Sequence, residues 1–202
     1  MSLNGRAART AGFTLIEMLV TITLMALLMA LAMPSMSAWV SNTKVRTVSN
    51  ALQDGLRQSQ AEALRRSRQV VFSLTNSSAP QTSLTAVANG SNWSINTVPS
   101  MTAGETGTFI EAGVLSAVGS GVQIAGPAAI CFNSVGRLVA NASSGVTGAT
   151  CTLPTTTPPV QSYNITLTGA DRPLRVLVAL GGQVRMCDPA KTLSGTNPDG
   201  CP

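Results

Sequence analysis

The first pattern along the chain is a long apolar run near its amino terminus. No residue from Met18 to Thr43 carries a charge, and Met18–Trp39 consists mainly of Leu, Met, Ala, Ile, Val and Thr. These 22 residues would form a helix of about 33 Å, long enough to cross the hydrocarbon core of a bilayer. A secretory signal peptide is the alternative, but it would be shorter and would end at a small-residue cleavage site. The run therefore predicts a transmembrane segment over about 18–39.

The helical pattern continues beyond the apolar run. Small or apolar residues then recur at spacings of three and four, which forms one stripe of an amphipathic helix. The stripe consists of Val45, Val48, Leu52, Leu56, Ser59 and Ala63. The sequence thus predicts a single helix over about 13–66, whose second half packs against the domain that follows it.

After Arg68 the pattern changes to short apolar or alternating runs separated by Gly, Pro, Asn and Ser, which is typical of antiparallel sheets. The predicted strands are 69–75, 92–97, 108–111, 121–125, 129–133, 137–140, 163–168, 173–179 and 183–186. Hairpin turns are predicted at 134–136 and 180–182, and an exposed low-complexity loop at 142–159. The fold class predicted is α+β: a long N-terminal helix packed on a C-terminal antiparallel β-domain over 67–202.

The composition argues against an enzyme. The chain has no histidine among its 202 residues, which excludes imidazole bases, Ser-His-Asp and Cys-His arrangements and most zinc sites. Eight acidic residues spread along the chain supply little for paired-carboxylate chemistry. Since no set of nucleophile, acid, base and metal ligands is visible, we expect a protein that is not an enzyme and needs no cofactor or metal.

Four cysteines, Cys131, Cys151, Cys187 and Cys201, lie in the last third of the chain, and none forms a CxxC motif. An even number of widely spaced cysteines in an exported chain predicts two disulfides and an oxidising compartment. Four cysteines allow three pairings. We prefer the nearest-neighbour pairing, because each bond would then close a loop rich in Gly, Pro, Ser and Thr.

Positive charge is concentrated after the apolar run. The formal net charge is +5, and the segment from Lys44 to Arg68 holds six basic residues against two acidic ones. Such a segment would suit nucleic acid or anionic lipid headgroups. A solvated helix face next to a membrane is the simpler interpretation, and we favour it.

One carboxylate, Glu17, lies inside the apolar stretch that starts at Gly12. A carboxylate near hydrocarbon costs a few kcal/mol even on mild insertion scales. No basic residue lies one helical turn away to pair with it. The sequence therefore predicts a partner from outside the segment, either another chain or a new amino terminus; the alternative is a side chain that extends to the membrane edge.

These residues resemble the class III signal of type IV pilins and type II secretion pseudopilins. The signal combines a short basic leader, the Gly12/Phe13 junction, a glutamate as fifth residue of the mature chain (Glu17) and a long apolar run. Pro34 is the twenty-second residue of that mature chain, where the family usually has a helix-kinking proline. The resemblance implies that residues 1–12 are a leader, and that a prepilin peptidase cuts after Gly12 and methylates the amine of Phe13.

The same resemblance implies how such a chain is used. Glu17 would pair with the terminal amine of a neighbouring subunit during filament assembly. The partners would be other pilin or pseudopilin subunits and an inner-membrane assembly machinery. The chain would cross the bacterial inner membrane once, with the leader in the cytoplasm and the head in the periplasm, before it enters a pilus or pseudopilus.

Three C-terminal segments, 131–137, 182–189 and 199–202, are similar to the H-type pseudopilin and FimT/FimU minor pilin group. This group caps or primes filaments. The sequence does not separate a minor pilin of a type IV pilus from an H-type minor pseudopilin of a type II secretion system.

Some FimT members bind DNA through a Gly-Arg-any-Arg motif. Here the matching segment is Gly182-Gln183-Val184-Arg185, with glutamine in place of the first arginine. Arg185, Arg137 and Lys191, together with Arg172 and Arg175, remain the candidates for a basic patch that would contact phosphates in DNA uptake. The simpler interpretation is that Arg185 is an ordinary exposed strand residue.

Overall fold

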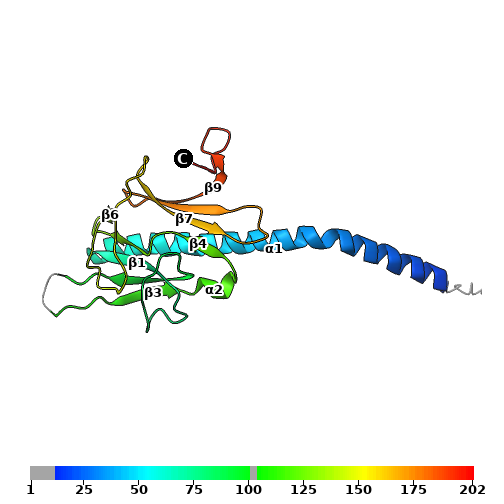
Figure 1. The fold of residues 1–202 in the computed structure, drawn as a ribbon, viewed down its shortest axis with the longest axis horizontal. Coiled ribbons are helices and arrows are strands. Elements are labelled where there is room, and N and C mark those ends of the chain that lie inside the picture. Colours follow the sequence, from blue (N-terminus) through cyan, green and yellow to red (C-terminus); the bar gives the residue numbers. More distant parts are fainter. Residues whose placement is uncertain (1–11, 101–103) are drawn as a thin grey trace, which may run out of the picture. The chain divides into compact units, whose positions relative to one another are not determined.

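The chain begins with one long helix and continues into a β-rich domain (Figure 1). The computed structural model describes residues 12–100 and 104–202, without the side chains of 32–35. Helix α1 spans Leu15–Arg66, 52 residues, close to the predicted 13–66. The chain divides into two units, Met1–Ser37 and Ala38–Pro202, so the second half of α1 belongs to the unit that contains the strands.

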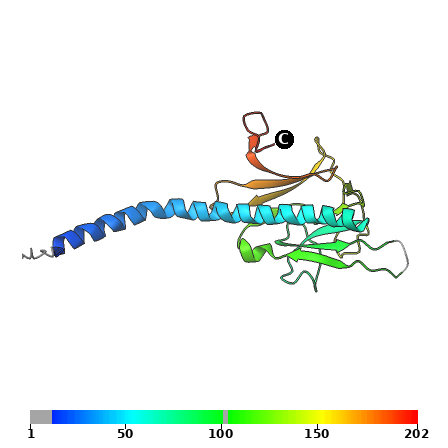
Figure 2. The ribbon, with the colours of Figure 1, turned by 180° about the vertical axis from the view of Figure 1, so that it is seen from behind.

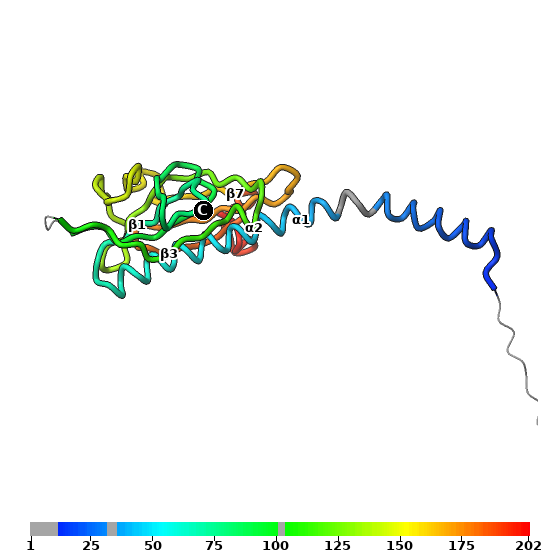
Figure 3. The backbone as a smooth tube through the Cα atoms, turned by 90° about the horizontal axis from the view of Figure 1, so that it is seen from below, coloured from blue at the N-terminus to red at the C-terminus, as the bar shows by residue number. Residues whose placement is uncertain are grey.

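Within the unit Ala38–Pro202, the predicted stripe of α1 faces the core. Its members Val45, Val48, Leu52, Leu56, Ser59 and Ala63 are all buried. In Figure 2 this cyan part of α1 runs in front of strands from both sheets, and Figure 3 shows it along one side of the strands. The helix therefore covers one face of both sheets.

The first sheet has the order β3-β2-β1-β5-β6 and is antiparallel throughout. Its strands are β1 (Val70–Thr75), β2 (Asn92–Thr97), β3 (Phe109–Gly113), β5 (Ala129–Phe132) and β6 (Leu138–Val139). Every residue of β1 is buried. One face of this strand packs in the main core, and the other packs under a second, smaller hydrophobic cluster on the outer side of the sheet.

The stretch 142–159 is mainly exposed and is held by Cys151, as predicted. Ser144, Ala149 and Cys151 are nevertheless buried within it. Ala149 and Cys151 pack with Val71 and Cys131 on the outer face of the first sheet. These few residues of a Ser/Thr/Gly-rich loop are buried because the Cys131–Cys151 disulfide fixes this part of the loop on the sheet.

The second sheet has the order β10-β9-β8-β7-β4. Its strands are β4 (Gln123–Ala125), β7 (Val160–Thr166), β8 (Leu174–Ala179), β9 (Val184–Thr192) and β10 (Gly200–Cys201). Strand β10, which runs parallel to β9, and the short helix α2 (Leu115–Val118) were not predicted. Strand β9 also continues six residues past its predicted end at 186, since pairing with β10 outweighs the turn preference of Asp188-Pro189.

The main core joins the helix to both sheets through large side chains. Phe72 of the first sheet stacks on Trp93 at 5.7 Å and meets Tyr163 of the second sheet edge-on at 6.3 Å. Tyr163 is fully buried, which raises the pKa of its phenol. A long N-terminal helix on two sheets, antiparallel except for the β9–β10 pair, confirms the predicted α+β fold class.

The two disulfides have the nearest-neighbour pairing predicted from their spacing. Cys131 of β5 bonds Cys151, with Cα atoms 5.6 Å apart. Cys187 of β9 bonds Cys201 of β10, with Cα atoms 5.1 Å apart. The first bond fixes the loop over the first sheet and the second holds the C-terminal strand on the second sheet.

The predicted hairpin turns meet α1 at one point. The amide of Gln60 donates to the carbonyl of Gly136 in the β5–β6 turn at 2.9 Å. The amide of Leu138 donates to the carbonyl of Leu180 in the β8–β9 turn at 3.0 Å. Gly182 has a φ of +88°, and a Cβ at this position would overlap Gly136 and Gln60. We call these contacts of Gln60 with the two turns at Gly136 and Gly182 the three-way junction. The junction connects the helix to both sheets.

Candidate functional site

The candidate site is the start of α1. Residues Gly12 to Thr14 are not helical, and the helix begins at Leu15. The hydroxyl of Thr14 accepts a hydrogen bond from the amide of Glu17 at 3.3 Å, and its carbonyl accepts one from the amide of Met18 at 3.2 Å. Thr14 is therefore the N-cap, and Glu17 lies in the first turn, where its charge interacts favourably with the helix dipole.

Sequence reasoning missed this cap. Thr14 and Glu17 have the Thr-x-x-Glu spacing of a capping box. This spacing indicates a helix that begins just after Thr14. The cap also moves the first helical residue from the predicted Phe13 to Leu15, because the N-cap residue itself has a non-helical backbone.

The carboxylate of Glu17 makes no hydrogen bond or ion pair with another residue in the part of the chain that the structure describes. It is surrounded in sequence by exposed apolar side chains, with Phe13 79% and Leu15 84% exposed. Exposed apolar residues continue along this part of the helix: Ile16, Met18, Leu19, Val20, Ile22, Leu24, Met25, Leu27, Leu28, Met29 and Leu31. A continuous apolar surface of this kind has to be covered by lipid or by other chains.

Among the described residues, no single unbroken helix has both the length and the apolar character of a membrane span. Two helical segments joined at a bend, Leu15–Leu31 and Met36–Arg66, satisfy both criteria when taken together. The predicted leader lies outside the described residues up to position 11, and so does the side chain of Pro34. Gly12 and Phe13, the predicted cleavage junction, are both exposed.

The candidate DNA-binding cations do not form one free patch. The guanidinium of Arg185 donates to the carbonyls of Pro198 at 2.8 Å and Gly200 at 3.0 Å, which holds the C-terminal strand against β9. Lys191 bonds the carboxylate of Asp199 at 2.6 Å.

The Lys191–Asp199 contact shifts the pKa values of both side chains. The hydrogen bond from Lys191 lowers the pKa of Asp199, and the same bond raises the pKa of Lys191. Among the described residues, the exposed side chains of Arg137 and Arg172 have no hydrogen bond or ion pair to another residue, whereas Arg175 donates to Asn164. Arg185 and Lys191 therefore serve internal contacts.

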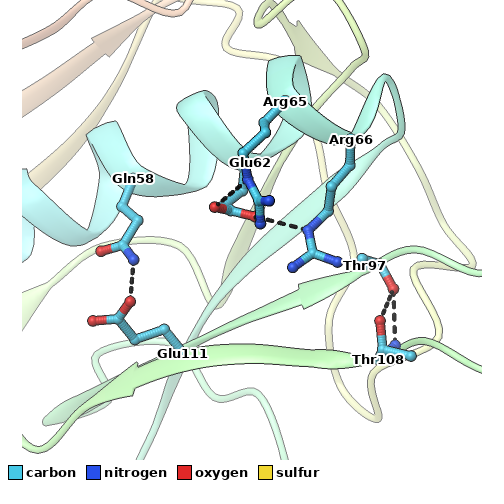
Figure 4. Close-up of polar contacts among 7 residues, drawn as sticks. All are labelled: Gln58, Glu62, Arg65, Arg66, Thr97, Thr108 and Glu111. Carbon is cyan, nitrogen blue, oxygen red and sulfur yellow. Dashed lines mark hydrogen bonds and ion pairs between the residues drawn. The ribbon is translucent and has the colours of Figure 1, made fainter.

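The basic segment 44–68 forms ion pairs near the C-terminal end of α1 (Figure 4). Glu62 accepts from Arg65 and from Arg66, each at 2.7 Å, and Arg68 pairs with Glu105. The hydrogen bond from Arg65 is the main reason that the pKa of Glu62 is lowered, followed by the bond from Arg66. The C-terminal part of the segment is thus salt-bridged, whereas Lys44, Arg46 and Arg57 form no ion pair with another described residue.

Among known protein families, one family model matches the amino-terminal segment of the chain. Residues 8–33 match a family model described as the prokaryotic N-terminal methylation motif. The chain carries a prokaryotic N-terminal methylation motif. The matched range includes the Gly12/Phe13 junction, Thr14 and Glu17, so the resemblance stated from these residues is confirmed at this segment. No curated protein matches the chain.

Two crystal structures of the type IV minor pilin FimU from Pseudomonas aeruginosa (strain PAO1) are similar to this chain. One is 13% identical with a TM-score of 0.45, over 71% of this chain and 96% of that one. The other is 12% identical with a TM-score of 0.47, over 75% and 96%.

Proposed function

We propose that this protein is a minor subunit of a type IV pilus-like filament, a structural protein without catalytic activity. In this proposal a prepilin peptidase removes residues 1–12 and methylates the amine of Phe13. The observation that carries the proposal is Glu17: a carboxylate without a described partner, in the first turn of an exposed apolar helix, inside a matched methylation motif.

The physical argument concerns the charge of Glu17. When apolar helices pack in a membrane or a filament core, an unpaired carboxylate costs a few kcal/mol. A cationic amine at Phe13 of a neighbouring subunit would remove that cost, because a close ion pair with good geometry offsets desolvation. Cleavage after Gly12 creates this amine, so one processing step would supply the partner that the chain itself lacks.

The disulfides support the proposed location. Both bonds lie in the β-domain, and disulfides persist in oxidising compartments such as the periplasm. We therefore place the head in the periplasm, the apolar part of α1 in the inner membrane and the leader in the cytoplasm. A role at the filament tip or in priming belongs to the same proposal.

Substitution of Glu17 tests the assembly role. Glu17→Gln keeps the size of the side chain and removes its charge, so we expect normal membrane insertion and head folding but little incorporation into filaments. Asp54→Asn is the matched control, because Asp54 is an exposed acid on the same helix. Incorporation is measured as the amount of this subunit in sheared filaments relative to the membrane fraction. Equal incorporation of Glu17→Gln and Asp54→Asn would refute the role of Glu17.

Deletion of the gene distinguishes the two machines. If the protein serves a type IV pilus, deletion removes surface pili and leaves the secretion of hydrolases intact. If it is instead an H-type minor pseudopilin of a type II secretion system, secretion is lost and pili remain. Both phenotypes have to be scored in the same strain, because the two filaments use similar subunits.

DNA uptake is the second candidate function, and its support is the exposed Arg137 on a chain of net charge +5. If it is correct, the protein binds duplex DNA without sequence preference, with an affinity that falls steeply as salt rises. Arg137→Ala should weaken this binding at every sequence tested, whereas Asp54→Asn should not. Unchanged binding of the Arg137 variant at low salt would remove Arg137 from the site.

A further inference from the structure

The outer face of the second sheet contains a pocket of about 220 Å³. Alternate residues of β7 and β8 point to opposite faces, so Tyr163 and Val176 enter the core while Ser162, Arg175 and Leu177 form the floor of the pocket. Its rim consists of Thr156, Thr157, Pro158, Val160 and Pro202. The volume is well above the roughly 10–15 Å³ that a single water molecule needs.

Among the described residues that line this pocket, only Arg175 has a charged side chain. Its Nε–H donates to the side-chain oxygen of Asn164, the residue opposite it on β7. Asn164 thereby fixes the plane of the guanidinium and leaves the terminal amino groups available. Arg175 forms no ion pair with a carboxylate in the described part of the chain, whereas Arg65, Arg66, Arg68 and Lys191 each do. A half-buried, unpaired guanidinium favours an anion as its ligand.

The other residues that line the pocket indicate which class of anion fits it. The hydroxyls of Ser162 and Thr157 have no hydrogen bond to another described residue, so both are available to donate. Leu177, which is 6% exposed, and Pro158 provide apolar contacts beside them. One guanidinium neutralises one negative charge, and its planar fork matches a carboxylate. An anion on a short aliphatic arm is therefore better matched than a phosphate dianion.

We propose that this pocket binds the carboxylate of an aspartate or glutamate side chain from another protein chain. The guanidinium of Arg175 pairs with the two carboxylate oxygens, Ser162 and Thr157 donate to them, and Leu177 and Pro158 contact the methylene groups. The rim residues Thr156–Pro158 are exposed, so an acidic side chain enters from solvent. This inference concerns the head alone and does not depend on the proposed filament role.

The experiment uses the full chain in detergent micelles, with no tag after Pro202 because Pro202 lines the pocket. The probes are N-acetyl-aspartate N-methylamide and its asparagine analogue, which has the same shape without the charge. Binding is followed by NMR of the Nε–H group of Arg175. We expect saturable binding of the aspartate probe and at least about tenfold weaker binding of the asparagine probe.

Two pairs of variants test the assignment. Arg175→Gln should abolish binding of the aspartate probe, followed through backbone amides of β7, whereas Arg172→Gln makes the same charge change outside the pocket and should leave it unchanged. Ser162→Asp places a carboxylate inside the pocket next to an intact Arg175, so it should also block the probe. Its control, Ser116→Asp, lies elsewhere in the head. Amide spectra that are unchanged outside the pocket show that each variant is folded.

The outcomes are distinct. Similar binding of the aspartate and asparagine probes, or retained binding in Ser162→Asp, overturns the proposal. Sodium acetate that binds as tightly as the aspartate probe assigns the pocket to free small carboxylates instead of a protein side chain. Inorganic phosphate that binds more tightly than the aspartate probe assigns it to phosphate. Binding that requires the carboxylate, its aliphatic arm and Arg175 together supports the proposal.

Discussion

Replacement of Gly182 by alanine tests how the helix is tied to both sheets. Gly182 has a φ of +88°, a backbone conformation that alanine adopts only with strain. An added Cβ would also overlap the carbonyl oxygen of Gly136 and the side-chain amide nitrogen of Gln60. The substitution therefore strains the β8–β9 turn and displaces the hydrogen bond between Gln60 and Gly136.

The expected loss of stability follows from these two effects. A left-handed conformation costs an alanine about 1–2 kcal/mol, and the displaced hydrogen bond contributes about 1 kcal/mol. We therefore expect Gly182→Ala to lower the free energy of unfolding by about 2–3 kcal/mol, a large share of the 5–15 kcal/mol typical of a domain. Gly181→Ala is the matched control, because a Cβ at that neighbouring position meets no atom within 4 Å.

The assay is urea unfolding of the full chain in detergent micelles, followed by the fluorescence of Trp93, which is 6% exposed in the core. A Trp39→Phe background removes the other tryptophan, which is 66% exposed. The reasoning is refuted if Gly182→Ala unfolds at the same urea concentration as its parent, or if Gly181→Ala loses as much stability.

Two further predictions concern charged side chains of the head. Arg185→Ala removes the bonds to the carbonyls of Pro198 and Gly200, so it should destabilise the C-terminal strand by about 1–3 kcal/mol and speed its amide hydrogen exchange; unchanged exchange together with weaker DNA binding would instead favour a nucleic-acid role. The pKa of Glu62 is lowered in the folded state by Arg65, so its stabilising effect is present above its ordinary pKa of 4.5 and is lost as the pH falls below that value. When the pH falls from about 6 to about 3, the free energy of unfolding measured in urea should therefore decrease less in Glu62→Gln than in the parent. An equal decrease in both proteins would contradict this role of Glu62.

The structure changes the interpretation of the Gly182–Arg185 segment. Sequence reasoning treated it as a weakened DNA-binding motif, since one arginine is replaced by glutamine. In the fold, Gly182 is required by the three-way junction and Arg185 holds the C-terminal strand. Neither role is visible locally, because the partners lie at Gln60, at Gly136 and in the last residues of the chain.

Local patterns determined the elements that depend on neighbouring residues. The spacing of apolar residues placed α1 from Leu15 to Arg66 within two residues, and alternation with turn residues placed β2 at Asn92–Thr97 and both hairpins. The methylation signal was also local, since Gly12, Phe13 and Glu17 lie within six positions. The Thr14 cap had an equally local signal.

Only the tertiary structure decided features that depend on distant partners. Strand β10 exists because a disulfide and Arg185 hold two residues against β9, and the burial of Ser144 and Ala149 depends on the first sheet beneath them. The pocket at Arg175 likewise needs two strands and a loop brought to one face. Short-range patterns report the preferences of neighbouring residues, whereas these contacts gain their free energy from groups that are far apart in the chain and meet only after folding.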